Sequence, residues 1–192
     1  VSMAHDHGSM TDDKKSTSDS ENADQDLSNK KSGEIVMDKS VDETFRLQLT
    51  NVYKTHLELM NAFLATQSSR AKTEASAVQL SLEKVDMGLV NGEMHNQWMM
   101  AVPKLNSTLG QIRNSEDIEA QRLAFADFSE ALYSAIKMFG VVNETIYFQY
   151  CPMARDGKGA YWLSTIKEIK NPYYGDAMIS CGETKEIIKL TY

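Results

Sequence analysis

The sequence lacks long apolar runs, an excess of positive charge and the signatures of common catalytic sites. No run of about 18 apolar residues exists, so we expect no transmembrane segment. The 20 basic residues are outnumbered by 27 acidic ones, and the formal net charge of −7 argues against nucleic acid and anionic membranes as partners. There is no nucleophile elbow, no Gly-rich phosphate loop before a helix and no H-E-x-x-H motif. We therefore expect that the protein is not an enzyme.

Cysteine is scarce, with Cys151 and Cys181 as the two residues of this type. Two thiols do not settle the redox compartment, because they can form one disulfide, act as two ligands or stay free. The chain begins at Val1 without an initiator Met or an apolar signal segment, which favours a processed N-terminus. Any signal segment or lipid anchor would then have been removed from this chain.

Residues 1–40 lack the apolar side chains that a folded segment needs. The stretch from Met10 to Ser32 contains a single leucine and no aromatic residue. It cannot bury enough apolar surface to offset its ordering entropy, so we expect a disordered polar tether. Its first ten residues contain an M-x-H-x-H-x-x-M tract that could chelate a copper ion without a fold, while a polar tail with chance histidines explains it equally well. The tract consists of Met3, His5, His7 and Met10.

Residues 41–140 show the apolar periodicity of helices. Apolar side chains recur at alternating four- and three-residue steps, which is typical of the buried seam of a helix bundle. Four such segments with short connections predict a mainly α fold, an antiparallel up-and-down four-helix bundle. The segments begin near Val41, Ala71, Glu93 and Ser115.

Local signals indicate where these helices begin, end or bend. Asp42 is suited to cap the first helix. Asn91-Gly92 is expected to end the second helix, with the glycine as a left-handed C-cap. Pro103 lies inside the third segment, so we expect a kink or a break near Val102. Gly140 ends the fourth helix.

After Gly140 the composition changes from helical to strand-like. Residues 145–151 are β-branched and aromatic, and residues 184–190 are compatible with a second short strand, although a helix stays open for the first stretch. We expect a small C-terminal β/loop element in which two strands carry the cysteines side by side. The chain thus divides into the tether, residues 1–40, and one domain, residues 41–192.

This C-terminal element concentrates soft metal ligands. Cys151-Pro152-Met153 is a C-x-M pair, and Met178-Ile179-Ser180-Cys181 is an M-x-x-C pair. Thiolates and thioethers select Cu(I) over hard cations, and Ag(I) fits such ligands equally well. Turn-forming residues between the pairs could fold the segment back and bring its two ends together. They are Gly157, Gly159, Asn171, Pro172 and Gly175.

Two alternatives to a metal site stay open. A disulfide between Cys151 and Cys181 would close a loop of about 31 residues and contribute on the order of 3–4 kcal/mol by restricting the unfolded chain. Spacing does not separate this hypothesis from metal ligation, because both need adjacent sulfur atoms. A thiol redox enzyme that uses both cysteines is the third hypothesis, and it would need an accessible thiol of low pKa.

Two histidines on the helix seams are further ligand candidates. His95 precedes Met99 by four residues on one helical face, which is a ligand spacing, and His56 lies on the first helix. A lone histidine on an apolar face is more often a hydrogen-bonded core residue. We expect Trp162 to anchor the loop by its apolar ring rather than to cover a cation.

The C-terminal motifs resemble those of the DUF3347 family. The resemblance is carried by Y-F-Q-Y-C-P-M-A, G-A-Y-W-L-S, I-K-N-P-Y-Y-G-D-A-M and S-C-G-E, and in weaker form by the helix around Tyr53. It covers about residues 41–190, with high specificity only after Tyr147, and leaves the tether out. The positions that the motifs carry over are Cys151, Met153, Met178 and Cys181.

The resemblance implies a location and a role by association. Domains of this family occur alone or attached to CusB-like heavy-metal efflux adaptors in Gram-negative bacteria, and no assigned activity comes with the family. A periplasmic or cell-envelope location, with lipid anchoring as an option, is therefore expected. The expected function is to hold or pass Cu(I) or Ag(I) in copper handling, with a heavy-metal efflux adaptor as partner. The alternative is a disulfide-stapled interaction domain of an efflux assembly with no metal of its own.

Overall fold

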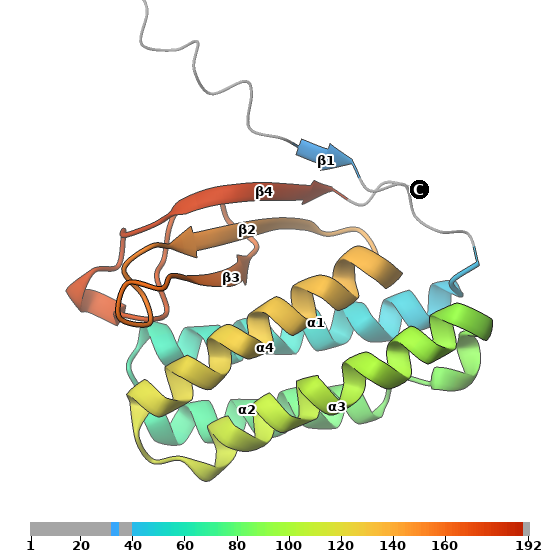
Figure 1. Ribbon diagram of the computed structural model, residues 1–192, viewed down its shortest axis with the longest axis horizontal. Coiled ribbons are helices and arrows are strands. Elements are labelled where there is room, and N and C mark those ends of the chain that lie inside the picture. Colours follow the sequence, from blue (N-terminus) through green and yellow to red (C-terminus); the bar gives the residue numbers. More distant parts are fainter. Residues whose placement is uncertain (1–31, 35–39, 190–192) are drawn as a thin grey trace, which may run out of the picture.

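The computed structural model describes residues 32–34 and 40–189, which form four long helices, a small sheet and two short 3₁₀ helices (Figure 1). The helices are α1 (Glu43–Leu64), α2 (Ser68–Glu83), η1 (Met87–Leu89), α3 (Gly92–Asn114), α4 (Ile118–Phe139) and η2 (Gly175–Ala177). The strands are β1 (Ser32–Glu34), β2 (Thr145–Cys151), β3 (Ala160–Ser164) and β4 (Glu183–Lys189).

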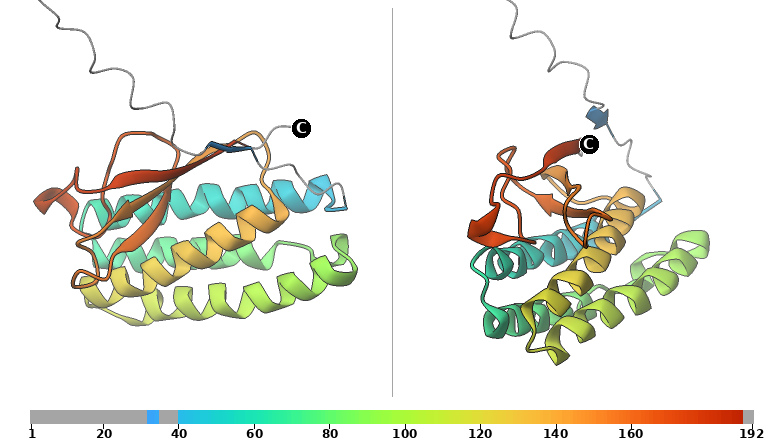
Figure 2. Two further views of the ribbon diagram at one scale, coloured as in Figure 1. Left: turned by 45° about the horizontal axis from the view of Figure 1, so that its top comes forward. Right: turned by 60° about the vertical axis from the view of Figure 1, so that its left-hand side comes forward.

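The helices and the sheet lie in layers. Figures 1 and 2 show the sheet over a face formed by α1 and α4, with α2 and α3 on the far side of these two helices. Each helix packs against the next one along the chain, and β3 packs against α4. The prediction of a mainly helical domain with a small C-terminal sheet is confirmed at this level.

Local hydrogen bonds explain where the helices begin and end. The Asp42 carboxylate accepts the N–H of Thr44 at 2.7 Å, which caps α1 and lowers the pKa of Asp42. Asp117 caps α4 in the same way, so α4 begins three residues later than its prediction at Ser115. Gly140, at φ +80°, ends α4 as predicted, and its N–H donates to the Ile136 carbonyl at 2.9 Å.

The predicted end of the second helix was wrong. The helix α2 ends at Glu83, and Asn91 is the N-cap residue of α3 rather than part of a C-cap. Apolar residues continue the helical spacing beyond Glu83, but the Asp86 side chain accepts the N–H of Gly88 at 2.8 Å. This local bond competes with helix continuation and converts the stretch into the short η1 turn.

Pro103 does not break α3, which runs without interruption from Gly92 to Asn114. The proline lies on the exposed side of the helix. Solvent can therefore hydrogen-bond the carbonyl of Met99, which loses its intrahelical donor to the proline ring. The expected break near Val102 is thus avoided.

The sheet has the strand order β1-β4-β2-β3. The strand β2 pairs antiparallel with β3 and with β4, while β1 adds to the outer edge of β4 in parallel. We predicted β2 and β4 but interpreted residues 161–163 as a loop anchor, and they belong to β3. The strand β1 lies within the stretch predicted as a tether, and this is a correction for residues 32–34. The rest of that stretch up to residue 39 lies outside the described residues and stays a prediction.

Aromatic contacts join the layers into one core. Trp98 of α3 meets Phe45 of α1 and Phe139 of α4 edge to face, with ring centroids 5.0 and 5.5 Å apart. On the other side, Phe148 of β2 stacks on Tyr133 of α4 at 3.8 Å. These contacts fix the sheet on the helices and so fix the position of its loops.

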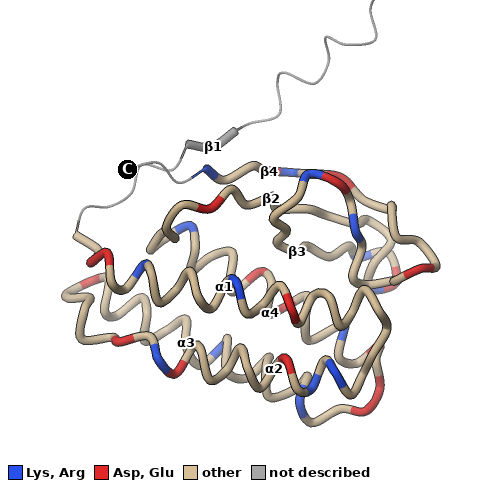
Figure 3. The backbone as a smooth tube through the Cα atoms, turned by 180° about the vertical axis from the view of Figure 1, so that it is seen from behind, with Lys and Arg blue, Asp and Glu red and all other residues tan. Residues whose placement is uncertain are grey.

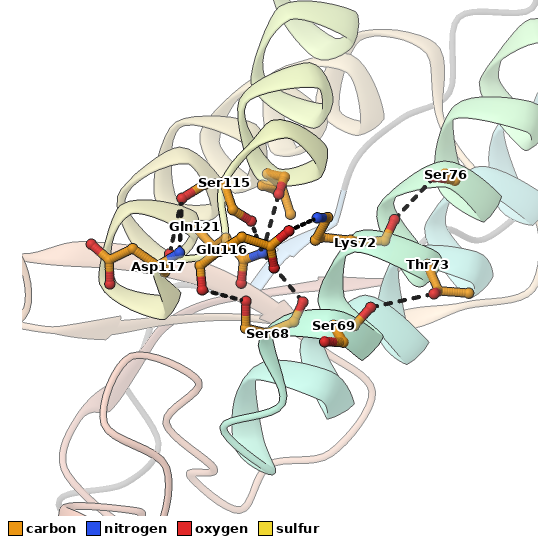
Figure 4. A network of polar contacts seen from close by, with 10 residues as sticks. Ser68, Ser69, Lys72, Thr73, Ser76, Ser115, Glu116, Asp117 and Gln121 are labelled. Atoms are coloured by element: carbon orange, nitrogen blue, oxygen red, sulfur yellow. Dashed lines mark hydrogen bonds and ion pairs between the residues drawn. The ribbon is translucent and has the colours of Figure 1, made fainter.

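A buried amide closes one end of the helical layers (Figure 4). Gln121 of α4 is fully buried, and its Nε2 donates to the carbonyls of Ser68, Ile112 and Ser115 at 2.8–3.2 Å. The Ser68 hydroxyl donates to the Glu116 carbonyl at 2.8 Å. The start of α2 is thereby tied to the turn between α3 and α4.

The charged surface is mixed. Figure 3 shows basic and acidic residues interspersed along the helices and loops. Among the helices that the structure describes, none has both the length and the apolar character needed to cross a membrane.

Replacing Leu82 by alanine tests the core packing of α2. Leu82 is 3% exposed, so Leu82→Ala should lower the free energy of unfolding by roughly 2–5 kcal/mol. The matched control is Leu80→Ala on the same helix, where the side chain is 58% exposed and the change should stay within about 0.5 kcal/mol. Urea denaturation measures both. Equal losses for the two variants would contradict the assignment of Leu82 to the core.

Candidate metal site

The two cysteines meet where β2 ends and β4 begins. Cys151 is the last residue of β2, and Cys181 lies two residues before β4. Tyr150 pairs with Glu183 in the antiparallel register, so the two segments are already adjacent at this point. The Sγ atoms of Cys151 and Cys181 are 3.3 Å apart, and the residues are not joined by a disulfide. The structure therefore brings the two sulfur atoms together, as the sequence predicted.

A glycine permits this approach. Gly182 has φ +140°, a conformation that residues with a side chain rarely adopt. A Cβ atom at this position would lie 2.8 Å from the Tyr150 carbonyl oxygen and 2.9 Å from the Trp162 ring. Any side chain at position 182 would push the segment with Cys181 away from β2.

The two thiols differ in burial. Cys151 is fully buried, while Cys181 is half-buried. The hydrogen bond with Cys151, followed by burial and by the charge of the Cys151 thiolate, raises the pKa of Cys181. A redox enzyme needs the opposite, an accessible thiol of low pKa.

The two methionines lie on turns that adjoin the cysteines. The N–H of Cys181 donates to the carbonyl of Met178 at 3.1 Å, so the M-x-x-C pair forms one tight turn. Met153 follows Cys151 by two residues at the start of the connection to β3. The side chains of Met153 and Met178 are 54% and 37% exposed. Both side chains thus reach solvent.

The connection from Met153 to β3 has a strained backbone. Arg155 and Asp156 both have φ +56°. This backbone conformation costs on the order of 1 kcal/mol or more for a residue other than glycine. Arg155 is held in this position by an ion pair with Asp127 of α4 at 3.2 Å. This turn lies in the connection between Cys151 and the start of β3 at Ala160.

Residues 171–175, here called the strap, hold both turns in place. The Nδ2 atom of Asn171 donates to the carbonyl of Cys181 at 2.8 Å. The backbone N–H of Asn171 donates to the carbonyl of Ile179, also at 2.8 Å. The hydroxyl of Tyr174 donates to the carbonyl of Met153 at 2.6 Å. The sequence marked Asn171 as a turn-former but gave no sign that its amide would reach Cys181, ten residues further along the chain.

Arg122 of α4 anchors the strap to the helices. Its Nε donates to the Pro172 carbonyl at 3.1 Å, and its Nη2 donates to the Phe63 carbonyl at 3.2 Å. At Gly175 the fit is close, since a Cβ there would lie 2.6 Å from the Thr66 hydroxyl. The strap is therefore fixed to the ends of α1 and α4. No sequence motif indicated this role for Arg122.

A pocket of about 230 Å³ lies beside the strap and the strained turn. Its lining includes two acidic and two basic side chains, Glu119, Asp156, Arg122 and Arg155. Arg122 forms an ion pair with Glu119, and Arg155 forms one with Asp127. The pocket thus presents balanced charge to a ligand.

His56 lies in the helical core. Its ring stacks on Tyr53 and on Phe125, with centroids 5.6 and 6.0 Å apart, and its Nδ1 lies 3.0 Å from the Tyr53 carbonyl oxygen. Complete burial lowers the pKa of His56 to about 4. These contacts are those of a core histidine, the interpretation that the sequence favoured over ligation.

The remaining predicted ligands are not joined to the cysteine pair. His95 and Met99 lie in the first turns of α3, which begins at the end of the helical layers remote from the cysteine loops (Figure 1). The Nδ1 atom of His95 lies 3.2 Å from the Met87 carbonyl oxygen of η1. Across residues 32–34 and 40–189, no three His, Cys, Asp or Glu side chains gather into a metal-binding group. Met3, His5, His7 and Met10 lie outside the described residues.

The protein is a helical domain with a small sheet, and two adjacent thiols lie where β2 ends and β4 begins. The model of the family described as "Protein of unknown function (DUF3347)" matches residues 52–144. The match spans just under half of the chain, and over these residues the chain is similar to the DUF3347 family. It runs from within α1 to the end of α4 and stops before β2, so it does not extend to the cysteine motifs that suggested the family. No curated protein and no solved structure matches the chain.

The burial of His56 predicts a pH-dependent stability. The folded-state pKa of about 4 lies below the ordinary value of 6.5, so between these values the unfolded chain binds a proton that the folded chain does not. The free energy of unfolding should fall as the pH is lowered through this window, by up to about 1.4 kcal/mol per pH unit. Urea denaturation from pH 7 to pH 4 measures the slope. The variant His56→Gln should show a flatter slope, and an unchanged slope would contradict the assignment.

Proposed function

We propose that this chain binds Cu(I), or the chemically similar Ag(I), at Cys151 and Cys181, and holds or passes the ion in copper handling at the bacterial envelope. The observation that supports this most is the 3.3 Å separation of the two sulfur atoms. The four helices, in this proposal an antiparallel up-and-down bundle, serve as the scaffold. A heavy-metal efflux adaptor is the proposed protein partner, and the location is periplasmic or cell-envelope with lipid anchoring as an option.

The geometry of the thiol pair fits a bridging ion after a small movement. Two metal–sulfur bonds of about 2.3 Å that span sulfur atoms 3.3 Å apart enclose an angle of about 90° at the metal. A separation of about 3.8 Å gives a tetrahedral angle, and about 4.6 Å gives a linear arrangement, for the same bond length of about 2.3 Å. The proposal assigns this small movement to the half-buried side chain of Cys181, since Cys151 is fully buried at the end of β2.

The methionines extend the donor set without adding charge. Met178 shares a hydrogen-bonded turn with Cys181, and Met153 follows Cys151 by two residues. Both side chains are exposed, although methionine is an apolar residue that normally fills cores. Thioethers on the turns next to two thiols would favour a soft monovalent cation over zinc, which usually takes four Cys, His or carboxylate ligands.

We propose a binding role rather than catalysis, so that the protein is not an enzyme. The raised pKa of Cys181 lowers its thiolate fraction, and the thiolate is both the nucleophile and the metal ligand. A Cu(I) ion can displace the thiol proton as it binds, whereas a catalytic nucleophile needs the thiolate before its substrate arrives.

A second candidate is a disulfide-stapled interaction domain of an efflux assembly, with no metal of its own. The same separation of 3.3 Å favours it, since the sulfur atoms need to approach by little more than 1 Å to reach a bond of about 2.05 Å. For a disulfide the two sulfur atoms move toward each other, and for a bridging metal they move apart by a similar distance. Binding measurements must therefore separate the two candidates.

Single substitutions at the four sulfur ligands test the metal site. Cys151→Ser and Cys181→Ser should lower the Cu(I) affinity by more than about 100-fold, because even residues that only support metal ligands contribute 10- to 100-fold. Met153→Leu and Met178→Leu keep the volume and remove a neutral donor, so about a tenfold loss is expected. The measurement is competition with a Cu(I) chelator in the presence of a reductant. Met100→Leu is the matched control, since Met100 is 73% exposed on α3 and should not change the affinity.

The outcome also decides between the two candidates. Equal Cu(I) affinity in the wild type and all four variants would contradict the metal site. In the disulfide alternative, each cysteine variant lowers the melting temperature relative to the oxidised wild type, and the methionine variants leave it unchanged.

A further inference from the structure

We propose that Asn171 is a positioning residue that holds the Cys181 thiol against Cys151. The inference rests on the proposed function in one respect, namely that the thiol pair is the functional site. It does not depend on which ion, if any, the pair binds.

Asn171 contacts the turn of residues 178–181 through both its side chain and its backbone. The side chain is fully buried, and its Nδ2 donates to the Cys181 carbonyl at 2.8 Å. The backbone N–H donates to the Ile179 carbonyl at 2.8 Å, inside the turn from residue 178 to residue 181. The Oδ1 atom accepts the N–H of Tyr173 at 2.8 Å, which fixes the orientation of the amide.

An amide of this length is needed for both side-chain bonds. Asparagine supplies a donor and an acceptor on one short planar group. Aspartate at position 171 could still accept from Tyr173, but it would place a carboxylate oxygen against the Cys181 carbonyl. Leucine would fill a similar volume and make neither bond. The following Pro172 restricts the backbone at 171 to extended conformations, which keeps the side chain pointed in one direction.

Asn171 links Cys181 to the rest of the strap, which is itself bound to the helices. The strap is fixed by the bond from Arg122 to Pro172 and by the tight fit of Gly175 against α1. By contrast, residues 178–180 are exposed. The bond from Asn171 is thus a direct link between the rigid part of the molecule and the residue that carries the outer thiol.

Positioning of this kind should raise the effective concentration of one thiol at the other. Thiol–disulfide exchange with oxidised glutathione measures it. One cysteine thiolate attacks the glutathione disulfide and releases one glutathione thiolate, and the second cysteine thiolate then displaces the second glutathione. The products are one Cys151–Cys181 disulfide and two reduced glutathione molecules. The equilibrium constant gives the effective concentration.

The experiment compares the full chain with Asn171→Leu, Asn171→Asp and a matched control. The control is Gln121→Leu, which removes another fully buried amide with three bonds to backbone carbonyls (Figure 4). Both Asn171 variants lose the hydrogen bond to the Cys181 carbonyl and should lower the effective concentration roughly five- to tenfold, the range expected for that one bond. Gln121→Leu should lower the melting temperature but leave the effective concentration unchanged. Circular dichroism checks the fold, and Asn171→Asp is the deciding variant if Asn171→Leu does not fold.

Two outcomes would overturn the inference: an unchanged effective concentration in the Asn171 variants, or an equal fall in the Gln121 control. Cu(I) competition on the same proteins keeps the two proposals distinct. A wild type that forms the disulfide readily but takes up no Cu(I) contradicts the metal site and leaves the role of Asn171 intact. A fall in effective concentration in both Asn171 variants, with the control unchanged, supports that role.

Discussion

The close approach of Gly182 to β2 is the constraint on which the site depends. The absence of a side chain lets the segment with Cys181 lie against the Tyr150 carbonyl and the Trp162 ring. The 3.3 Å separation of the two sulfur atoms follows from this approach and from the antiparallel register of β2 and β4. The sheet in turn keeps its position because Phe148 of β2 stacks on Tyr133 of α4, Tyr161 of β3 stacks on Phe148, and β3 packs against α4. The helices therefore determine the site although none of them carries a sulfur atom of the pair.

The helices could be predicted because their signals are local. Apolar spacing and capping residues such as Asp42 act within one or two turns of the chain. The same logic failed at Asn91-Gly92, since an Asn-Gly pair suits the end of one helix as well as the approach to the next. The strands β1 and β3 were missed for different reasons. The partner of β1 is β4 at the other end of the chain, and a pairing between distant segments leaves little trace in the sequence of either one. The strand β3 pairs with the neighbouring β2, but its apolar residues 161–163 were interpreted as a loop anchor.

The chemistry of the candidate site could be predicted, but its support could not. Cysteine and methionine can be identified as soft ligands from the residue type alone. The turn-forming residues between the two pairs indicated that the pairs could meet. The contacts that hold the pair join residues far apart along the chain, such as Arg122 and Pro172, which are 50 positions apart. Nothing in the spacing of those residues indicates the bond. The match to the DUF3347 family covers the helical part, so it describes the scaffold and not the sulfur pair.

The two tryptophans of the chain lie in different layers, and this has a spectroscopic consequence. Trp98 is enclosed by the rings of Phe45 and Phe139 in the helical core, while Trp162 borders Gly182, the neighbour of Cys181. With Trp98 replaced by phenylalanine, the tryptophan fluorescence of the chain would come from the one indole that borders Gly182. Its emission would then follow the local environment of Cys181, whether the change there is an arriving ion, a new sulfur–sulfur bond or a displaced turn.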